Sequence, residues 1–211
     1  PHVPDNETIE QFRDYVDAII RSGNKPQGQR YLSKNNNNIL RLPALQEAFP
    51  NATIVIPFRD PVQQALSLRR QHRRFVADDQ ADPFAGQYMA WLAHYEFGAN
   101  HRPFCFDEQA LQRLSQSDPE SLDHWLDLWA HVYENVLNSA PENALFLSYE
   151  RLCDSQYDTW NTLLERTGLA DWPGASEQVF KLSSKDHDES ISDELMQRTQ
   201  AVYEQLLARG I

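Results

Sequence analysis

The sequence is short of several features that define whole classes of protein. It has two cysteines, Cys105 and Cys153, far apart in the chain, which argues against a disulfide scaffold or a cysteine-based metal site. No apolar run approaches the 18 residues of a membrane-spanning helix. The seven glycines form no cluster of the GxxxxGK[ST] type that holds nucleotide phosphates. With 41% hydrophobic and 24% charged residues, the composition is that of a globular protein.

Basic residues are scarce except in one segment. The chain has 19 Lys and Arg against 31 Asp and Glu, a net charge of -12, which argues against a nucleic-acid-binding surface. Between Arg30 and Arg74, however, eight basic residues face only two acidic ones. A local cationic patch in an acidic protein suits a small anionic ligand. For Arg69, Arg70, Arg73 and Arg74, a solvated helix face is an equally good explanation.

The basic segment contains a strand, turn and helix pattern. The apolar run Thr53–Phe58 is typical of a strand buried on both faces. Asp60 is a good helix N-cap and Pro61 a good first helical residue, and apolar residues then follow at helical spacing. Arg59 is therefore predicted at the carboxyl end of a strand, where open α/β sheets bind ligands. An arginine beside a helix N-terminus is suited to an anion, most naturally a phosphate.

The rest of the chain predicts a single domain, 1–211, of the α/β class. A second buried strand is expected at 144–147, and a parallel sheet follows from short buried strands that alternate with helices. A short strand is also possible at 30–33, and the aromatic residues of 84–97 are expected to pack in the core of a helix. Further helices are predicted at 7–21, 39–49, 118–139, 155–167 and 192–208 and from Pro61 onward, with loops at 78–82 and 181–190. The chain begins PHVPDN, without an initiator Met, and we expect further strands to precede Pro1.

The run SKNNNNILRLPALQEAFPNATIVIPFRDPVQQALSL resembles the core of the sulfotransferase family that uses 3′-phosphoadenosine 5′-phosphosulfate. The matching elements are the Lys34 loop, Phe49-Pro50-Asn51-Ala52, Arg59-Asp60-Pro61 and Ser67. Trp129, Tyr133 and Tyr149-Glu150-Arg151-Leu152 extend the likeness, and HYEFG (94–98) with RPF (102–104) is similar to a bacterial-type branch. The resemblance implies a P-loop NTPase-like fold, a three-layer parallel sheet with helices on both faces. This chain would represent it incompletely, without the N-terminal strand and phosphate loop.

The resemblance also implies which residues bind the nucleotide. Arg59 and Ser67 would hold its 3′-phosphate, and Tyr149 and Lys185 are the further cofactor-binding candidates, Lys185 as part of a basic C-terminal loop. Ser67 lies six residues past Pro61, about 9 Å along a helix. A phosphate bonded to both Arg59 and Ser67 would therefore lie beside the helix and not at its tip.

The implied activity is transfer of a sulfuryl group from 3′-phosphoadenosine 5′-phosphosulfate to a hydroxyl or amine, with no metal. Lys34 would stabilise the charge that develops on the bridging oxygen, or orient the acceptor. Where relatives carry a catalytic His or Glu, this chain has Ser33 and asparagines, and a neutral amide takes no proton at neutral pH. His72 is the expected substitute base, whereas His94, on an aromatic helix, is better explained as structural.

Several questions stay open at this stage. The acceptor is expected to be a small molecule or a carbohydrate, with no nucleic acid, and the location is expected to be cytoplasmic. Aromatic residues in 94–104 would suit an apolar acceptor pocket, although core packing explains them equally well. Two other functions remain: another nucleotide-binding or phosphotransferase protein of P-loop-like fold, and a non-catalytic helical interaction domain. The oligomeric state and the activity of this chain alone are also open.

Overall fold

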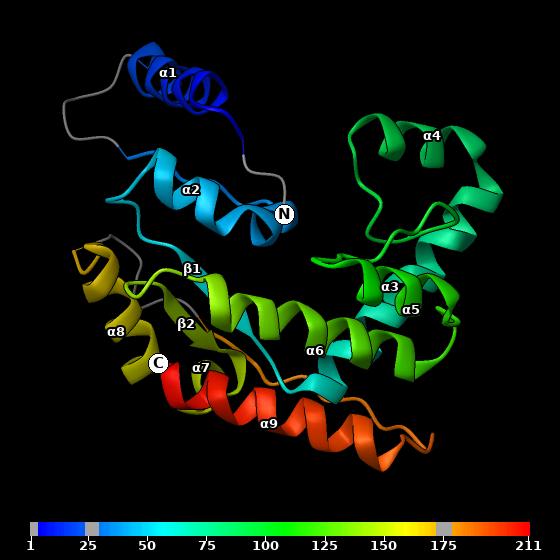
Figure 1. Cartoon of the computed structure of the whole chain (residues 1–211). Coiled ribbons are helices and arrows are strands. Elements are labelled where there is room, and N and C mark those ends of the chain that lie inside the picture. Colours follow the sequence, from blue (N-terminus) through cyan, green and yellow to red (C-terminus); the bar gives the residue numbers. More distant parts are fainter. Residues whose placement is uncertain (1–3, 24–29, 172–178) are drawn as a thin grey trace.

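The computed structural model describes residues 4–23, 30–171 and 179–211, and its centre is a small parallel sheet (Figure 1). Strands β1 (Val55–Phe58) and β2 (Leu145–Ser148) pair in parallel, with Phe58 opposite Ser148. The C-terminus extends this sheet, because the Ile211 backbone N–H donates to the Phe146 carbonyl at 2.9 Å. The predicted α/β class with a parallel sheet is confirmed, and the larger three-layer sheet stays a prediction.

Nine α-helices make up most of the part of the chain that the structure describes. They are α1 (Asn6–Ser22), α2 (Leu42–Ala48), α3 (Pro61–Ala81), α4 (Pro83–Trp91), α5 (Glu108–Gln116), α6 (Leu122–Ser139), α7 (Tyr149–Asp154), α8 (Gln156–Thr167) and α9 (Asp193–Arg209), with a 3-10 helix η1 (Asn36–Arg41) before α2. Two predicted boundaries are confirmed in detail. The Asp60 carboxylate caps α3 by accepting from the Gln63 N–H at 2.9 Å. Gly168 ends α8 with a φ of 68°, which glycine adopts without strain.

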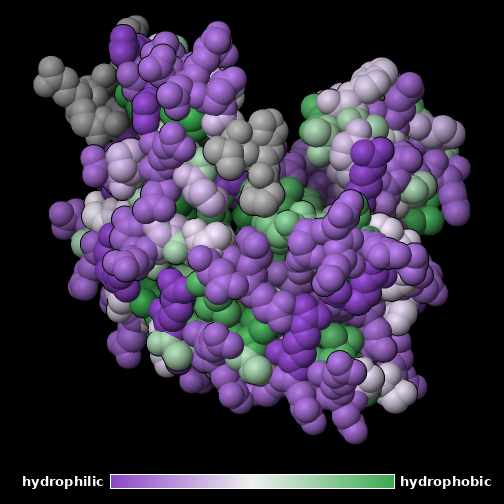
Figure 2. Space-filling view, viewed as in Figure 1, coloured by the Kyte–Doolittle hydropathy of each residue, from purple (hydrophilic) through white to green (hydrophobic). Residues whose placement is uncertain are grey.

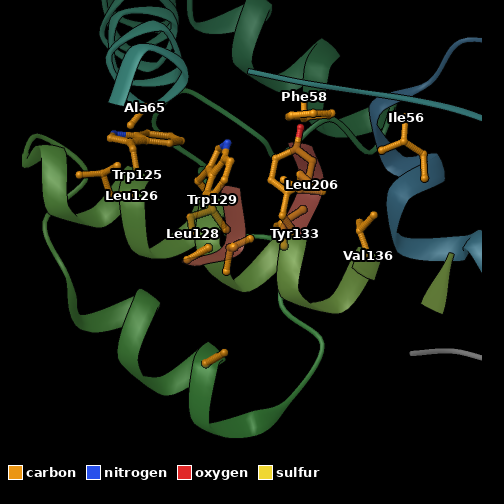
Figure 3. Close-up of a cluster of buried hydrophobic side chains, with 14 of the residues drawn as sticks. Ile56, Phe58, Ala65, Trp125, Leu126, Leu128, Trp129, Tyr133, Val136 and Leu206 are labelled. Carbon is orange, nitrogen blue, oxygen red and sulfur yellow. The ribbon is translucent and has the colours of Figure 1, made fainter. Parts of the chain in front are cut away.

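Helix α6 organises the core. Its buried side chains Trp125, Trp129 and Tyr133 leave the helix towards β1 and α3, as Figure 3 shows. The Trp129 indole N–H donates to the Gln64 side-chain oxygen at 3.1 Å. The Tyr133 hydroxyl donates to the Pro57 carbonyl at 2.9 Å. These two bonds, each worth about 1 kcal/mol, fix the end of β1 and the start of α3 against α6. The position of the intervening turn is thereby set.

The prediction that β1 is buried on both faces is wrong. Ile56 and Phe58 are buried, whereas Val55 and Pro57 are exposed. Side chains alternate along a strand, and only one face of β1 packs into the cluster formed with α6. The predicted strand at 30–33 is also wrong, because this segment has no strand pairing.

The predicted acidic loop at 78–82 is wrong as well, because α3 continues to Ala81. Its carboxylates have local partners: Asp79 accepts from the Ala99 N–H at 2.8 Å, and Asp82 caps α4. Helix α6 begins at Leu122 and not at Asp118, because Ser121 is the residue that caps it.

The aromatic residues of α4 are not core residues. Phe84, Tyr88 and Trp91 are 56%, 49% and 66% exposed, so core packing is wrong for these three. The reason is that α4 stands away from the body of the protein and packs against α3 (Figure 1). Phe97, from the same aromatic run, does join the core and stacks on Trp125 at a centroid distance of 5.9 Å.

Candidate functional site

Arg59 lies where the two strands end. Since Phe58 pairs with Ser148, the next residues, Arg59 and Tyr149, leave the sheet side by side. The Arg59 guanidinium lies over the Tyr149 ring, 4.7 Å from its centroid. Its Nε is buried without a hydrogen bond, and the nearest carboxylate, Glu150, is 3.8 Å away. The same Glu150 accepts from the Asp60 backbone N–H at 3.0 Å, which ties the two turns together.

A C-terminal segment, which we call the 181–185 strap, crosses this edge of the sheet. The Tyr149 hydroxyl donates to the Lys181 carbonyl at 2.7 Å and accepts from the Ser183 N–H at 3.2 Å. Arg59 donates to the Ser183 carbonyl. The segment 181–190, predicted as a polar loop that carries Lys185, begins with main-chain atoms that hydrogen-bond to residues at the sheet edge.

The end of the strap is held by α3. The Gln63 side chain forms two bonds with the Lys185 backbone, donating to its carbonyl at 2.9 Å and accepting from its N–H at 2.7 Å. The Lys185 ammonium donates to the Ser67 hydroxyl at 2.5 Å. Gln63 and Ser67 lie one helical turn apart, so they share a face of α3. The four predicted nucleotide-binding residues, Arg59, Ser67, Tyr149 and Lys185, are thus brought together, although their role stays a prediction.

The charge at this cluster is positive and partly desolvated. Burial lowers the pKa of Lys185, and the positive charges of Arg59 and Arg70 lower it further. A cation with a lowered pKa beside two other cations would be stabilised by an anion. A phosphate with its two or three negative oxygens would supply such an anion. The arrangement is therefore chemically suited to phosphate binding beside α3, as the spacing of Arg59 and Ser67 predicts.

The neighbouring arginines have structural partners. Arg69 is only 6% exposed and forms an ion pair with Glu189, which follows the strap. Arg73 pairs with Glu120 at 2.7 Å, and Arg74 lies 3.8 Å from Asp78. Arg69 therefore belongs neither to a free cationic patch nor to a solvated helix face. Close to the sheet edge, Arg59 and Arg70 of the basic segment are the positive charges that act on Lys185.

Lys34 lies apart from this cluster, on the wall of a cavity of about 870 Å³. Its ammonium donates to the Asn36 side-chain oxygen at 2.8 Å, at the start of η1. The asparagine run, predicted as a loop, thus supplies both a 3-10 helix and a partner for the lysine. The cavity also reaches Pro57 and Gln64, which border the turn that carries Arg59.

His72 belongs to a buried histidine cluster that sequence reasoning missed. Its ring lies 5.3 Å from that of His101 and 5.4 Å from that of Trp125. His101 Nε2 lies 3.1 Å from His124 Nε2, and His124 Nδ1 lies 2.6 Å from the Ser117 hydroxyl. His72 is 5% exposed, and its catalytic role stays a prediction that the geometry does not favour. The spacing of 72, 101 and 124 carries no periodic signal, since three separate segments supply the rings.

Burial keeps these histidines neutral. It lowers the pKa of His72 and of His101, and it lowers the pKa of His124 to about 4, with the neighbouring imidazoles adding repulsion at His101 and His124. Despite the cluster, the described residues contain no group of three or more His, Cys, Asp or Glu arranged to hold a metal. Both cysteines are free thiols.

Arg59, Ser67, Tyr149 and Lys185, which we call the arginine cluster, lie together at the carboxyl edge of a parallel sheet. Comparison with known families then assigns the chain. Residues 2–112, more than half of the sequence, match the model of the sulfotransferase family, and the chain belongs to that family. The match includes Lys34, Arg59, Ser67 and His72 and ends before Tyr149 and Lys185. No curated protein and no solved structure matches the chain. No helix in the described ranges has the length and apolar character needed to cross a membrane.

Proposed function

We propose that the protein is a sulfotransferase that uses 3′-phosphoadenosine 5′-phosphosulfate and transfers its sulfuryl group to a hydroxyl or amine. Family membership supports the reaction class. The observation that carries the choice of donor is that Lys185, from a distant part of the chain, meets the stretch that carries Arg59 and Ser67. Three polar or cationic groups around one point beside α3 are suited to the 3′-phosphate of this nucleotide.

In this proposal the arginine cluster binds and orients the donor without touching the sulfur. Arg59 would bond the 3′-phosphate through its guanidinium, and Ser67 and Lys185 would supply the remaining donors. These three groups already bond one another or the strap, so a phosphate would replace the Lys185–Ser67 contact and the Arg59–Ser183 contact. Lys34, in the neighbouring cavity, would stabilise the negative charge that grows on the bridging oxygen.

The proposal is tested by nucleotide binding to this chain, measured by calorimetry and by the rise in melting temperature. Adenosine 3′,5′-bisphosphate should bind and stabilise the fold, whereas adenosine 5′-monophosphate, which lacks the 3′-phosphate, should bind much more weakly. Arg59→Ala should reduce affinity for the bisphosphate by about tenfold to a hundredfold, as expected for loss of charge-assisted hydrogen bonds.

Arg74→Ala is the matched control, because Arg74 lies further along α3, outside the group of four predicted nucleotide-binding residues, and pairs with the exposed Asp78. It should leave the affinity unchanged. Equal binding of the two nucleotides, or an equal loss of affinity in the two variants, would show that the arginine cluster does not bind the 3′-phosphate.

A further inference from the structure

The cavity beside Lys34 is too large to be a packing defect. Its volume of about 870 Å³ lies within the range of about 300–1,000 Å³ that is usual for small-molecule sites. Close-packed interiors leave few voids larger than a water molecule. Figure 2 shows a hollow between the α1–α2 side of the molecule and the α4 side, with apolar surface at its floor.

The lining of the cavity is mainly apolar and aromatic. Phe97 and Phe104 line it from the segment between α4 and α5, and Trp125 and Trp129 line it from α6. The exposed face of β1 contributes Val55 and Pro57, while α2 and the turn after it contribute further apolar residues, Leu45, Ala48 and Phe49. Such a wall offers flat apolar surfaces and few hydrogen-bond partners, so it fits an apolar ring system better than a sugar.

Polar groups gather on another part of the wall. Lys34 lies there with Asn35, Asn36 and Asn38, all from the segment at the start of η1. The other cation of the lining, Arg102, is stacked over the Tyr95 ring at 4.4 Å. A ligand with an apolar body and one polar end would therefore place its polar end near Lys34.

Helix α3 joins this cavity to the arginine cluster. Gln63 and Ser67 form hydrogen bonds with Lys185 of the strap. Gln64 and Leu68, the residues that follow them on α3, line the cavity. Successive helical residues are rotated by about 100°, so the two sites lie on adjacent faces of one helix, within about 10–12 Å, its overall diameter. A nucleotide held at the arginine cluster could extend its 5′ end into the cavity that contains Lys34.

We propose that this cavity is the acceptor site and that the acceptor is a hydroxyl compound with an aromatic or similarly flat apolar body. The assignment rests on the proposed function. The acceptor oxygen would bond to the sulfur of the donor as the bond from sulfur to the bridging phosphate oxygen breaks. The electron pair of that bond stays on the phosphate of the leaving bisphosphate, and the hydroxyl proton passes to water. Lys34, which lines the cavity, would stabilise the leaving oxygen.

The test is equilibrium dialysis of 2-naphthol against this chain, with methyl β-glucoside as the carbohydrate comparison. 2-Naphthol should bind with a Kd of about 0.1 mM or tighter, as expected for a ligand of its size in a fitting apolar site. The glucoside should show no binding in the same range. Val55→Glu, which places a carboxylate on the cavity wall at a strand position already 36% exposed, should weaken 2-naphthol binding by about tenfold or more.

Val179→Glu is the matched control, because Val179 is 67% exposed and does not line the cavity. It should leave binding unchanged. Absence of 2-naphthol binding, equal binding of the glucoside, or equal effects of the two valine variants would each overturn the acceptor assignment. Far-UV circular dichroism and the melting temperature of both variants establish that they fold.

The outcome is separable from that of the proposed function. If adenosine 3′,5′-bisphosphate binds in an Arg59-dependent manner and 2-naphthol does not bind, the acceptor assignment fails and the donor site stands. If 2-naphthol binds in a Val55-dependent manner and the bisphosphate does not bind, the donor site fails, and the cavity loses its role as an acceptor site with it.

Discussion

Mild acid should destabilise this protein in a pH range where carboxylates are still ionised, because of the buried cluster of His72, His101 and His124. All three have a pKa lowered chiefly by burial. In the unfolded chain a histidine takes up a proton near pH 6.5. Protons therefore bind the unfolded chain before they bind the folded one, and the free energy of unfolding falls as the pH drops below about 6.5.

The magnitude follows from His124, whose pKa falls to about 4. A difference of about 2.5 pKa units from the unfolded value corresponds to about 3 kcal/mol once the pH is below both values, and to about 2 kcal/mol at pH 5. His72 and His101 act in the same direction and add to this loss. Among the charged groups around the cluster, Glu120 raises the pKa of His72 and Arg73 lowers it. Burial remains the largest effect on that pKa.

Carboxylates contribute at lower pH. Arg69, for example, holds the pKa of Glu189 below its usual range, so the stability from that ion pair is lost only as the pH falls below about 4.5. The window between pH 7 and pH 5 therefore reports mainly the histidines. The free energy of unfolding at each pH is measured by urea titration followed by tryptophan fluorescence. Trp125 is a suitable reporter, since it lies against all three imidazoles.

His124→Gln is the informative variant. It lowers stability at pH 7.5, because a buried partner of Ser117 and His101 is lost, but it should remove about 2 kcal/mol of the difference between pH 7.5 and pH 5. His187→Gln, at an exposed position, should keep the full difference. A wild-type stability that is flat over this range, or a His124→Gln variant with an unchanged pH slope, would refute the reasoning.

Two further substitutions test packing that supports the candidate site. Tyr133→Phe removes the buried hydroxyl that donates to Pro57 and should cost about 1 kcal/mol in urea denaturation, because the Pro57 carbonyl loses this partner; an unchanged midpoint would mean that water replaces the bond. Gly98→Ala should cost about 1–3 kcal/mol in the same assay, because its φ is 86° and an added Cβ would lie 2.6 Å from the Asp79 carboxylate; full stability would show that the 96–104 segment shifts freely.

Local rules predicted the turn that carries Arg59 because the relevant signals lie within a few residues. Asp60 and Pro61 specify the start of α3 by capping and by the fixed φ of proline, and both roles are confirmed. The run before them specifies a strand, but burial on both faces depends on what packs there. One face of β1 packs against α6, which is distant in the sequence, and the other face lines the cavity. The exposure of Val55 and Pro57 could therefore not be predicted from the strand residues themselves.

The candidate site depended on contacts that no local pattern encodes. That Tyr149 lies beside Arg59 follows from the register of β1 with β2, and that Lys185 meets Ser67 follows from the path of the strap. The resemblance predicted these residues one by one, and the structure supplies their convergence. Periodicity failed for Phe84, Tyr88 and Trp91, because helical spacing of aromatic residues does not reveal whether another element covers them.

The strap is positioned mainly through its main-chain atoms, whereas its positive charge is on its side chains. Gln63, Tyr149 and Arg59 bond only its main-chain atoms, at Lys181, Ser183 and Lys185. Apart from the Lys185 ammonium, which donates to Ser67, the hydrogen bonds that set the course of the strap therefore do not depend on the side chains that it displays. Related proteins could vary the residues of this segment, and hence the ligand that it meets, while the scaffold beneath it stays the same.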